Sequence, residues 1–198
     1  MTTPPAGPGD GPFEPEYPIR TARLLLRPYQ PDDVDAVHAY ERLPETVRYL
    51  SNEPMGRAEA EALVTRRVDS STLGGMGEVA NMIIELAQTG ELVGDCVLFW
   101  YGHGQAEVGY VLSPAHYGRG YATEVVGALL RLGFDGLGMH RITGRLDARN
   151  VASARVLERA GLRREAHLVE NEIVKGEWTD ELIYAILRGE WEARQAAG

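Results

Sequence analysis

The hydrophobic residues of this chain gather in short runs typical of strands, and turn residues or charged helical stretches separate these runs. Thr89-Gly90 is a turn signal between two of them, so those two are expected to pair as a hairpin. The runs that predict strands cover residues 23–27, 79–86, 92–100, 106–112, 142–146 and 182–187, with a further strand expected within 168–174.

Helical periodicity is strongest at residues 121–134. Apolar residues recur there at spacings of three, four and seven, as on one face of a helix: Ala122, Val125, Val126, Leu129, Leu130 and Phe134. Further helices are predicted after Pro31, at 57–69 and at 150–160, where Gly161 is a stop signal. Strands predominate first and then alternate with helices. This order predicts a mixed α/β domain of the α+β type, with a hairpin-built half and a crossover half.

The length and composition suit one soluble domain. The chain has 198 residues, 44% of them hydrophobic, and residues 1–18 are rich in proline and glycine. A disordered tail is therefore predicted over 1–18 and a single domain over 19–198. The single Cys96 rules out an internal disulfide framework. Neither a membrane-spanning run nor a secretory signal is recognisable, so a cytoplasmic location is expected.

Charge narrows the choice of partners. The formal net charge is -9. Nucleic-acid binding relies on clustered lysine and arginine, so an acidic chain is not expected to bind nucleic acid. A basic protein or a cationic amine is electrostatically easier to receive.

Residues 108–132 carry the strongest chemical signal. An apolar strand runs into a turn that holds Gly118 and Gly120, and the turn opens the helix predicted from Tyr121. Glycine lets a backbone approach a ligand closely. The unpaired N–H groups of a first helical turn, together with the helix dipole, favour an anion. The ligand is therefore expected to carry phosphate.

Other glycine motifs fit this turn less well. A P-loop needs Lys followed by Ser or Thr after its second glycine, whereas Tyr121 and Ala122 follow Gly120. A dinucleotide fingerprint needs a third glycine where Thr123 stands, and an acidic strand end closer than Asp147. An ordinary turn with glycines at positive φ remains open for this stretch alone.

A second motif favours a phosphate-binding turn over an ordinary one. Residues 147–165 read D-A-R-N-V-A-S-A-R-V-L-E-R-A-G-L-R-R-E. With the glycine turn before it, the chain resembles the GNAT superfamily of acyl-coenzyme A N-acyltransferases, and most of all the branch with the ribosomal-protein alanine and serine N-acetyltransferases. The resemblance covers roughly residues 20–187. Its matching features are Gly109-Tyr110, the G-R-G-Y-A-T-E stretch at 118–124, Asn150 with Ser153, residues 157–161, and Gly176-Glu177-Trp178 with Asp180 and Tyr184.

The resemblance implies a fold and a cofactor site. The fold would be a mostly antiparallel sheet with a splayed parallel strand pair and helices on both faces. Acetyl-coenzyme A would lie in the splay. The backbone of Tyr110, Val111 and Leu112 would pair with its pantetheine amides, and Asn150 would bond the same arm. The pyrophosphate would be held by the amides of Gly118, Arg119, Gly120, Tyr121, Ala122 and Thr123. The arginines at 119, 145 and 149 either meet the adenosine 3′-phosphate or form a solvated basic face.

The implied reaction is direct transfer of acetyl from sulfur to a primary amine in a ternary complex, with no metal. The amine must be neutral, which at pH 7 costs about 1.4 kcal/mol for an N-terminal amine and about 4.6 kcal/mol for lysine. The favoured base is Glu172, with Glu107 second and water as a further possibility. Many family members protonate the leaving thiolate with a tyrosine that follows the Asn motif. This chain has none there, so Ser153 is the expected partner.

The acceptor is left open between a protein N-terminus and a small-molecule amine. A homodimer is common in this branch and is one expected assembly. The alternative function is a coenzyme A-binding sensor or partner module without catalysis, which would keep the glycine turn but need neither a base nor a thiolate partner.

Overall fold

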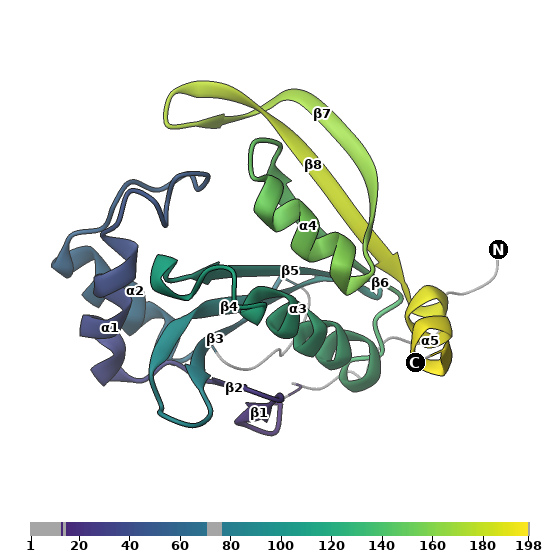
Figure 1. The fold of residues 1–198 in the computed structure, drawn as a ribbon, viewed down its shortest axis with the longest axis horizontal. Helices are drawn as coiled ribbons and strands as arrows, with labels where there is room; N and C mark the ends of the chain where they lie inside the picture. The colour runs from purple at the N-terminus through teal and green to yellow at the C-terminus, as the bar shows by residue number, and fades with distance from the viewer. Residues whose placement is uncertain (1–12, 14, 71–76, 198) are drawn as a thin grey trace.

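A computed structural model describes residues 13, 15–70 and 77–197. Its centre is one eight-stranded sheet in the order β1-β2-β3-β4-β5-β6-β8-β7 (Figure 1). Every neighbouring pair is antiparallel except β5 and β6, which are parallel. The strands are β1 (Ile19–Arg20), β2 (Leu24–Arg27), β3 (Val79–Leu86), β4 (Leu92–Gly102), β5 (Gln105–Leu112), β6 (Arg141–Asp147), β7 (Arg163–Val174) and β8 (Glu177–Leu187).

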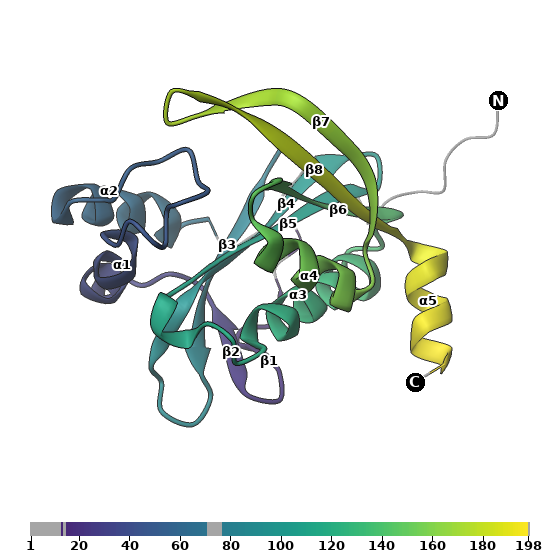
Figure 2. The same ribbon diagram turned by 45° about the horizontal axis from the view of Figure 1, so that its top comes forward.

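Helices cover both faces of the sheet, as Figures 1 and 2 show. Side chains that alternate along a strand point to opposite faces of the sheet, so one strand contributes to the core on each face. Met82 and Ile84 of β3 join the larger core beneath α3 and α4, whereas Ile83 between them joins a smaller core beneath α1 and α2. The predicted mixed α/β fold is therefore confirmed. The helices are α1 (Val34–Glu41), α2 (Arg57–Val68), α3 (Tyr121–Arg131), α4 (Val151–Ala160) and α5 (Arg188–Ala197), with short helical turns η1 (Pro31–Asp33), η2 (Pro114–His116) and η3 (Leu132–Gly136).

The parallel strands β5 and β6 pair over only part of their length. Their register runs from Gln105 and Arg141 to Glu107 and Thr143, where the Thr143 hydroxyl donates to the carbonyl oxygen of Ala106 over 3.2 Å. Beyond this point β5 continues to Leu112 paired with β4, and β6 continues to Asp147 paired with β8. The expected splay is therefore present, and it leaves one backbone edge of β5 free to bond a ligand.

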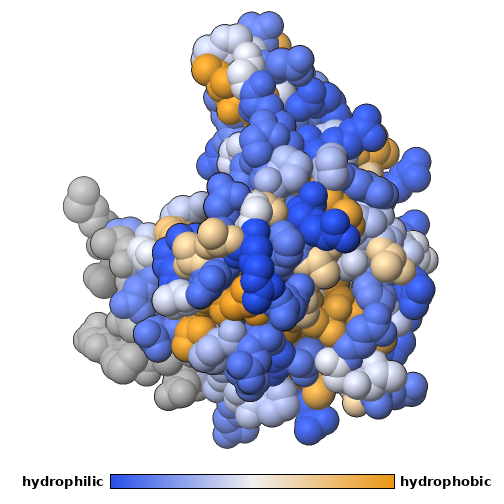
Figure 3. Space-filling model, turned by 90° about the vertical axis from the view of Figure 1, so that its left-hand side faces the viewer, coloured by the Kyte–Doolittle hydropathy of each residue, from blue (hydrophilic) through white to orange (hydrophobic). Residues whose placement is uncertain are grey.

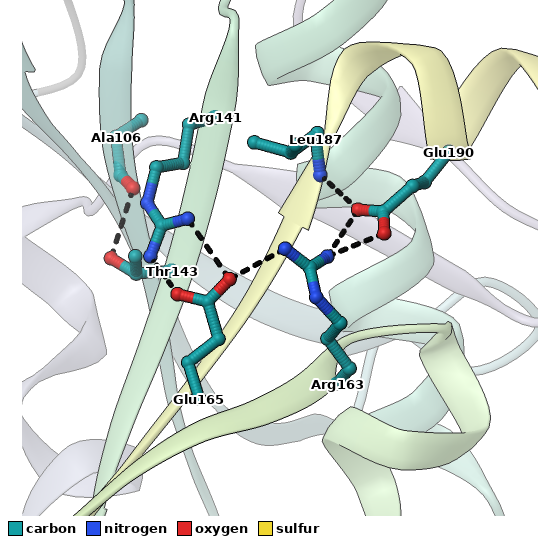
Figure 4. Close-up of polar contacts among 7 residues, drawn as sticks. All are labelled: Ala106, Arg141, Thr143, Arg163, Glu165, Leu187 and Glu190. Carbon is teal, nitrogen blue, oxygen red and sulfur yellow. Dashed lines mark hydrogen bonds and ion pairs between the residues drawn. The ribbon is translucent and has the colours of Figure 1, made fainter.

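The hairpin of β7 and β8 extends from the edge of the sheet and is longer than the sequence pattern predicts. Most β7 side chains are exposed, so the strand shows no apolar alternation that would mark its start at Arg163. A polar network fixes the base of this hairpin (Figure 4). Glu165 bridges Arg141 of β6 and Arg163, and Arg163 in turn meets Glu190 of α5.

Other boundaries differ by smaller amounts. The helix predicted to reach Phe134 ends at Arg131 and passes into the π-helical turn η3. Both β1 and α5 were absent from the sequence prediction, and α5 is anchored by Trp191, which stacks on Phe134 with ring centroids 5.7 Å apart. Most of the predicted tail over 1–18 lies outside the described residues. The same is true of Gly74 and Gly75, which in the sequence are expected to end the helical stretch at 57–69. Within the described part of the tail, Phe13 and Tyr17 pack against the core.

Within the described ranges, no helix has the length and apolar content that a membrane crossing requires. In the same part of the chain, His, Cys, Asp and Glu side chains form no group of three or more suited to a metal ion.

Candidate active site

The glycine turn has the backbone geometry of an anion site. Gly118 and Gly120 have φ angles of +73° and +79°, where a side chain would be strained, and α3 begins directly afterwards. The Glu124 amide donates to the Gly120 carbonyl over 3.2 Å as the first bond of this helix. The amides of residues 121–123 precede that bond, so they are available to an anion at the positive end of the helix.

Glu124 ties this turn to the N-terminal strands. It accepts hydrogen bonds from the Thr21 hydroxyl at 2.5 Å and the Arg23 amide at 2.7 Å, and it forms an ion pair with the Arg23 guanidinium. Arg23 also donates to the Arg119 carbonyl inside the turn over 2.9 Å. Burial alone would raise the pKa of Glu124, but the hydrogen bonds from Thr21 and Arg23 outweigh it and lower that pKa. Sequence reasoning missed this clamp because its members lie about a hundred positions apart.

A cavity of about 480 Å³ adjoins the turn. It brings together nearly all the residues predicted to bind the cofactor: Tyr110, Val111, Leu112, Gly118, Gly120, Tyr121, Ala122, Thr123 and Asn150. The exception is Arg119, whose guanidinium donates to the Ala115 carbonyl over 3.1 Å. Asn150 is also the N-cap of α4, since its side-chain oxygen accepts from the Ser153 amide over 3.1 Å.

A second cavity of about 810 Å³ meets the first one. Figure 3 views the molecule from the side that carries α1 and α2, where the mostly hydrophilic hairpin stands above the body. The loop after α1 and the hairpin touch at the Lys175 ammonium group, which donates to the Val47 carbonyl over 2.9 Å. Six residues line both cavities: Tyr49, Leu50, Tyr110, Val111, Asn150 and Ser153. These shared residues mark where two ligands, one in each cavity, would meet.

The two cavities carry opposite charge. Five carboxylates and two guanidinium groups line the larger cavity: Asp95, Glu107, Asp147, Glu172 and Glu181, with Arg67 and Arg145. Three arginines and one glutamate line the smaller: Arg48, Arg155 and Arg159, with Glu45. A phosphate-bearing ligand therefore fits the smaller cavity, and a cation fits the larger.

The two predicted bases, Glu107 and Glu172, lie in the walls of the larger cavity and differ in setting. Burial raises the pKa of Glu107, and the Tyr101 hydroxyl donates to its carboxylate over 2.7 Å. Glu172 comes from the hairpin, its side chain is 52% exposed, and it lies 3.8 Å from the Arg145 guanidinium. Arg145 is bound more closely by the buried Glu181, at 2.6 Å.

The predicted thiolate partner, Ser153, has a neighbour that the sequence did not reveal. The Tyr110 hydroxyl donates to the Ser153 hydroxyl over 3.1 Å, and burial raises the pKa of this phenol above its usual value. Both side chains lie where the cavities meet. Tyr110 was selected for its backbone alone, because strand periodicity says nothing about contact with a helix 43 positions later.

Asp95 and His116 are two further buried polar residues near the cavities, and both have charged or polar partners. Asp95, inside β4, accepts from the Tyr40 hydroxyl and forms an ion pair with Arg67 at 3.0 Å. His116, beside the glycine turn, is 5% exposed and lies 3.2 Å from a Glu91 carboxylate oxygen. Of the arginines considered for a 3′-phosphate, Arg145 binds Glu181 and Arg149 binds Asp147 at 2.6 Å.

A mixed sheet with a splayed parallel pair, a phosphate-suited turn and two joined cavities is the arrangement expected of a group-transfer enzyme of the acyl-coenzyme A type. Residues 23–163 match the family described as the acetyltransferase (GNAT) domain. The chain is 33% identical over 176 residues to the uncharacterised N-acetyltransferase YnaD of Bacillus subtilis, covering 87% of this chain and 98% of that protein. The chain belongs to the GNAT acetyltransferase family, which confirms the resemblance to that superfamily seen in the sequence.

Solved structures of acetyltransferases share this fold. A GNAT-family acetyltransferase from Bacillus anthracis superposes with a TM-score of 0.79 at 30% identity, covering 86% of this chain and 98% of that one. Spermidine N-acetyltransferase from Vibrio cholerae, solved with CoA and spermine, shares the fold with a TM-score of 0.72 at 24% identity. That match covers 87% of this chain and 99% of the Vibrio protein.

Proposed function

We propose that this protein transfers the acetyl group of acetyl-coenzyme A to a primary amine of a small molecule that carries further positive charge, with polyamines as the leading class. The observation that carries the proposal is the charge of the two joined cavities. The smaller one offers cations and helix amides to an anion. The larger one offers a cation Glu107 and Glu172, the two lining carboxylates that are not held in a close ion pair like those of Asp95, Asp147 and Glu181. Coenzyme A and a polyamine have those opposite charges.

Membership of the GNAT family supports acetyl-coenzyme A as the acyl donor, and one relative supports a polyamine as the acceptor. The Vibrio cholerae protein named spermidine N(1)-acetyltransferase is 24% identical over 86% of this chain and provides a precedent for a polyamine substrate. A basic protein N-terminus is the second acceptor class, and the negative cavity suits it on the same electrostatic ground. A module without catalysis needs no second cavity, so the structure favours an enzyme.

Acetyl-coenzyme A would supply the acetyl group as a thioester, held in the smaller cavity by the β5 edge and the glycine turn. A free β5 amide near Val111 would donate to the thioester carbonyl oxygen, and so stabilise the negative charge that develops there. The amine nitrogen, arriving from the larger cavity, forms a bond to the carbonyl carbon as the bond from that carbon to sulfur breaks.

We assign the base to Glu107 rather than Glu172. A base that works near neutral pH needs a raised carboxylate pKa, and burial raises the pKa of Glu107. Glu107 and Val111 are four positions apart, or about 13 Å along a strand, so water would carry the proton between the amine and this carboxylate. Glu172 would instead attract the cationic part of the acceptor, a role suited to an exposed carboxylate beside Arg145.

The Tyr110 and Ser153 pair would serve the leaving group. Ser153 would donate a hydrogen bond to the thiolate, and Tyr110 would replenish that proton through its bond to Ser153. A buried phenol with a raised pKa keeps its proton at neutral pH, so Tyr110 remains a hydrogen-bond donor to Ser153 while Ser153 donates to the departing thiolate.

A thiol-release assay with acetyl-coenzyme A tests this proposal. The amine panel contains spermidine, spermine, alanine- and serine-terminated peptides, lysine and an amino sugar. We expect polyamines to give the highest kcat/KM and Glu172→Gln to raise their KM about tenfold with little change in kcat. Glu61→Gln is the matched control, since Glu61 is an exposed α2 residue outside both cavities. A preference for uncharged or anionic amines would overturn the acceptor class, and no release with any amine would overturn the activity.

A further inference from the structure

The smaller cavity contains a group of arginines that the proposed mechanism does not use. Arg155 and Arg159 of α4 and Arg48 of the loop after α1 line it. The two α4 residues are one turn apart, so their like charges share one face of the helix. Neither forms an ion pair with any carboxylate in the part of the chain that the structure describes, and the same is true of Arg48, which lies over the Tyr49 ring at 5.3 Å.

Other arginines near the two cavities do have carboxylate partners. Arg145, which lines the larger cavity, and Arg149, which lines neither cavity, are each bound by a carboxylate at 2.6 Å. Glu158, between Arg155 and Arg159 in the sequence, accepts from the Tyr184 hydroxyl over 3.1 Å. Glu45 is the acidic side chain that shares the lining with the arginines. The smaller cavity therefore carries a local excess of positive charge that calls for an anionic ligand.

Coenzyme A has two separate phosphate groups. The amides at the start of α3 suit its pyrophosphate, which leaves the phosphomonoester on the adenosine ribose without a partner. That phosphomonoester has three acceptor oxygens and a charge near −2 at neutral pH. Arginine binds such a group through paired, charge-assisted hydrogen bonds. Helices α3 and α4 lie side by side in Figures 1 and 2, so both phosphate sites open into the same cavity.

We propose that Arg155 and Arg159, assisted by Arg48, bind the 3′-phosphate of coenzyme A and select it over 3′-dephospho-coenzyme A. This inference rests on the proposed use of coenzyme A. It assigns the phosphomonoester to arginines of α4 and the α1 loop, and away from Arg145 and Arg149.

Calorimetric titration of the full chain with coenzyme A and with 3′-dephospho-coenzyme A tests the assignment without relying on turnover. The wild type should bind coenzyme A at least tenfold more tightly than the dephospho form. The double substitution R155A/R159A should weaken coenzyme A about tenfold and leave the dephospho form within twofold. Arg48→Ala should show the same selective loss, about threefold, because one loop arginine contributes less than two on a helix.

Arg131→Ala is the matched control, since this exposed α3 residue lies outside the cavity and should change neither affinity. Equal weakening of both ligands by the double substitution would overturn the assignment, as would a wild type that binds both equally well. If the wild type bound neither ligand, the proposed use of coenzyme A would itself fail, which is a different outcome. Circular dichroism of each variant checks that the fold is intact.

Discussion

The Tyr110 hydroxyl of β5 donates to the Ser153 hydroxyl of α4 over 3.1 Å, at the place where the two cavities meet. This contact joins the strand edge that would hold the thioester to the helix that follows the Asn150 motif. It gives the serine a proton source that the helix itself lacks, since residues 151–160 contain no tyrosine.

The first prediction concerns this pair. Ser153→Ala should lower kcat about 100-fold and Tyr110→Phe about tenfold, with the KM for acetyl-coenzyme A nearly unchanged, because the pair acts on the leaving group. The double variant should be no slower than Ser153→Ala, since the two hydroxyls act in series. Steady-state thiol release measures all three.

Tyr184→Phe is the control for this series, because Tyr184 is a buried tyrosine with a bonded hydroxyl outside both cavities. It should leave kcat unchanged. Additive losses from Tyr110→Phe and Ser153→Ala would show that the two side chains act independently.

The second prediction concerns the pH dependence of the base. Glu107 must be ionised to accept a proton, so activity should rise with pH through its raised pKa. The hydrogen bond from Tyr101 favours the ionised form, so Tyr101→Phe should raise this pKa further and move the rising limb of kcat/KM to higher pH. Glu107→Gln should remove that limb and lower kcat at least 100-fold.

The pH profiles are measured with the same amine throughout, so that ionisation of the substrate is common to every variant. Glu172→Gln provides the comparison. If it removed the rising limb while Glu107→Gln retained it, the base would be Glu172.

The third prediction concerns a buried carboxylate behind the acceptor cavity. Glu41 of α1 is 4% exposed, and one of its oxygens has no hydrogen-bond partner among the described residues. Burial raises its pKa from 4.5 to about 7. The folded state therefore binds this proton more tightly than the unfolded state, and the free energy of unfolding should fall as pH rises from about 4.5 to about 7.

Glu41→Gln should remove this dependence. The variant should be more stable than the wild type at pH 8 by about 1–2 kcal/mol, a discounted value because Arg67 and solvent screen the charge, and the difference should vanish near pH 4. Urea denaturation at the two pH values measures it. A constant difference at both would mean that the substitution acts through packing.

The fourth prediction concerns the clamp on the glycine turn. Glu124→Ala removes bonds to Thr21 and Arg23 and should cost about 1–2 kcal/mol of stability at pH 7. The pKa of Glu124 is lowered in the folded protein, so its contribution is present above the unfolded pKa and is lost as pH falls through the folded value. The KM for acetyl-coenzyme A should rise as well, because Arg23 also holds the turn at Arg119.

The fifth prediction concerns the turn itself. Gly120→Ala forces a side chain into a backbone with φ of +79°, at a cost of about 1–2 kcal/mol, and should weaken coenzyme A binding. Gly127→Ala is the matched control in the same helix. Apart from its chain neighbours and the backbone of its own helix, no described residue has an atom within 4 Å of the added methyl group. The substitution should therefore be neutral or stabilise by up to about 1 kcal/mol. Thermal unfolding measures the change in stability, and calorimetric titration measures the change in affinity for coenzyme A.

Local patterns along the chain predicted much of this architecture. A strongly apolar run predicted β3 from Val79 to Leu86, and one apolar face predicted α3 from Tyr121. The spacing of Gly118 and Gly120 before that helix predicted an anion site, because backbone conformation and helix polarity are local properties. Hydrophobic periodicity marks an element only when one of its faces is buried. The largely exposed β7 was therefore predicted too short, and the mostly exposed terminal helix α5 was not predicted at all.

By itself, then, the sequence determined the family, the turn that suits phosphate and the set of chemical groups near it. Only the tertiary structure decided which of those groups meet. It brought Tyr110 to Ser153 and Glu124 to Arg23, and it separated the paired arginines at 145 and 149 from the unpaired ones at 155 and 159. The reason is that burial, pKa and ion pairing depend on neighbours distant in the chain, which periodicity does not encode.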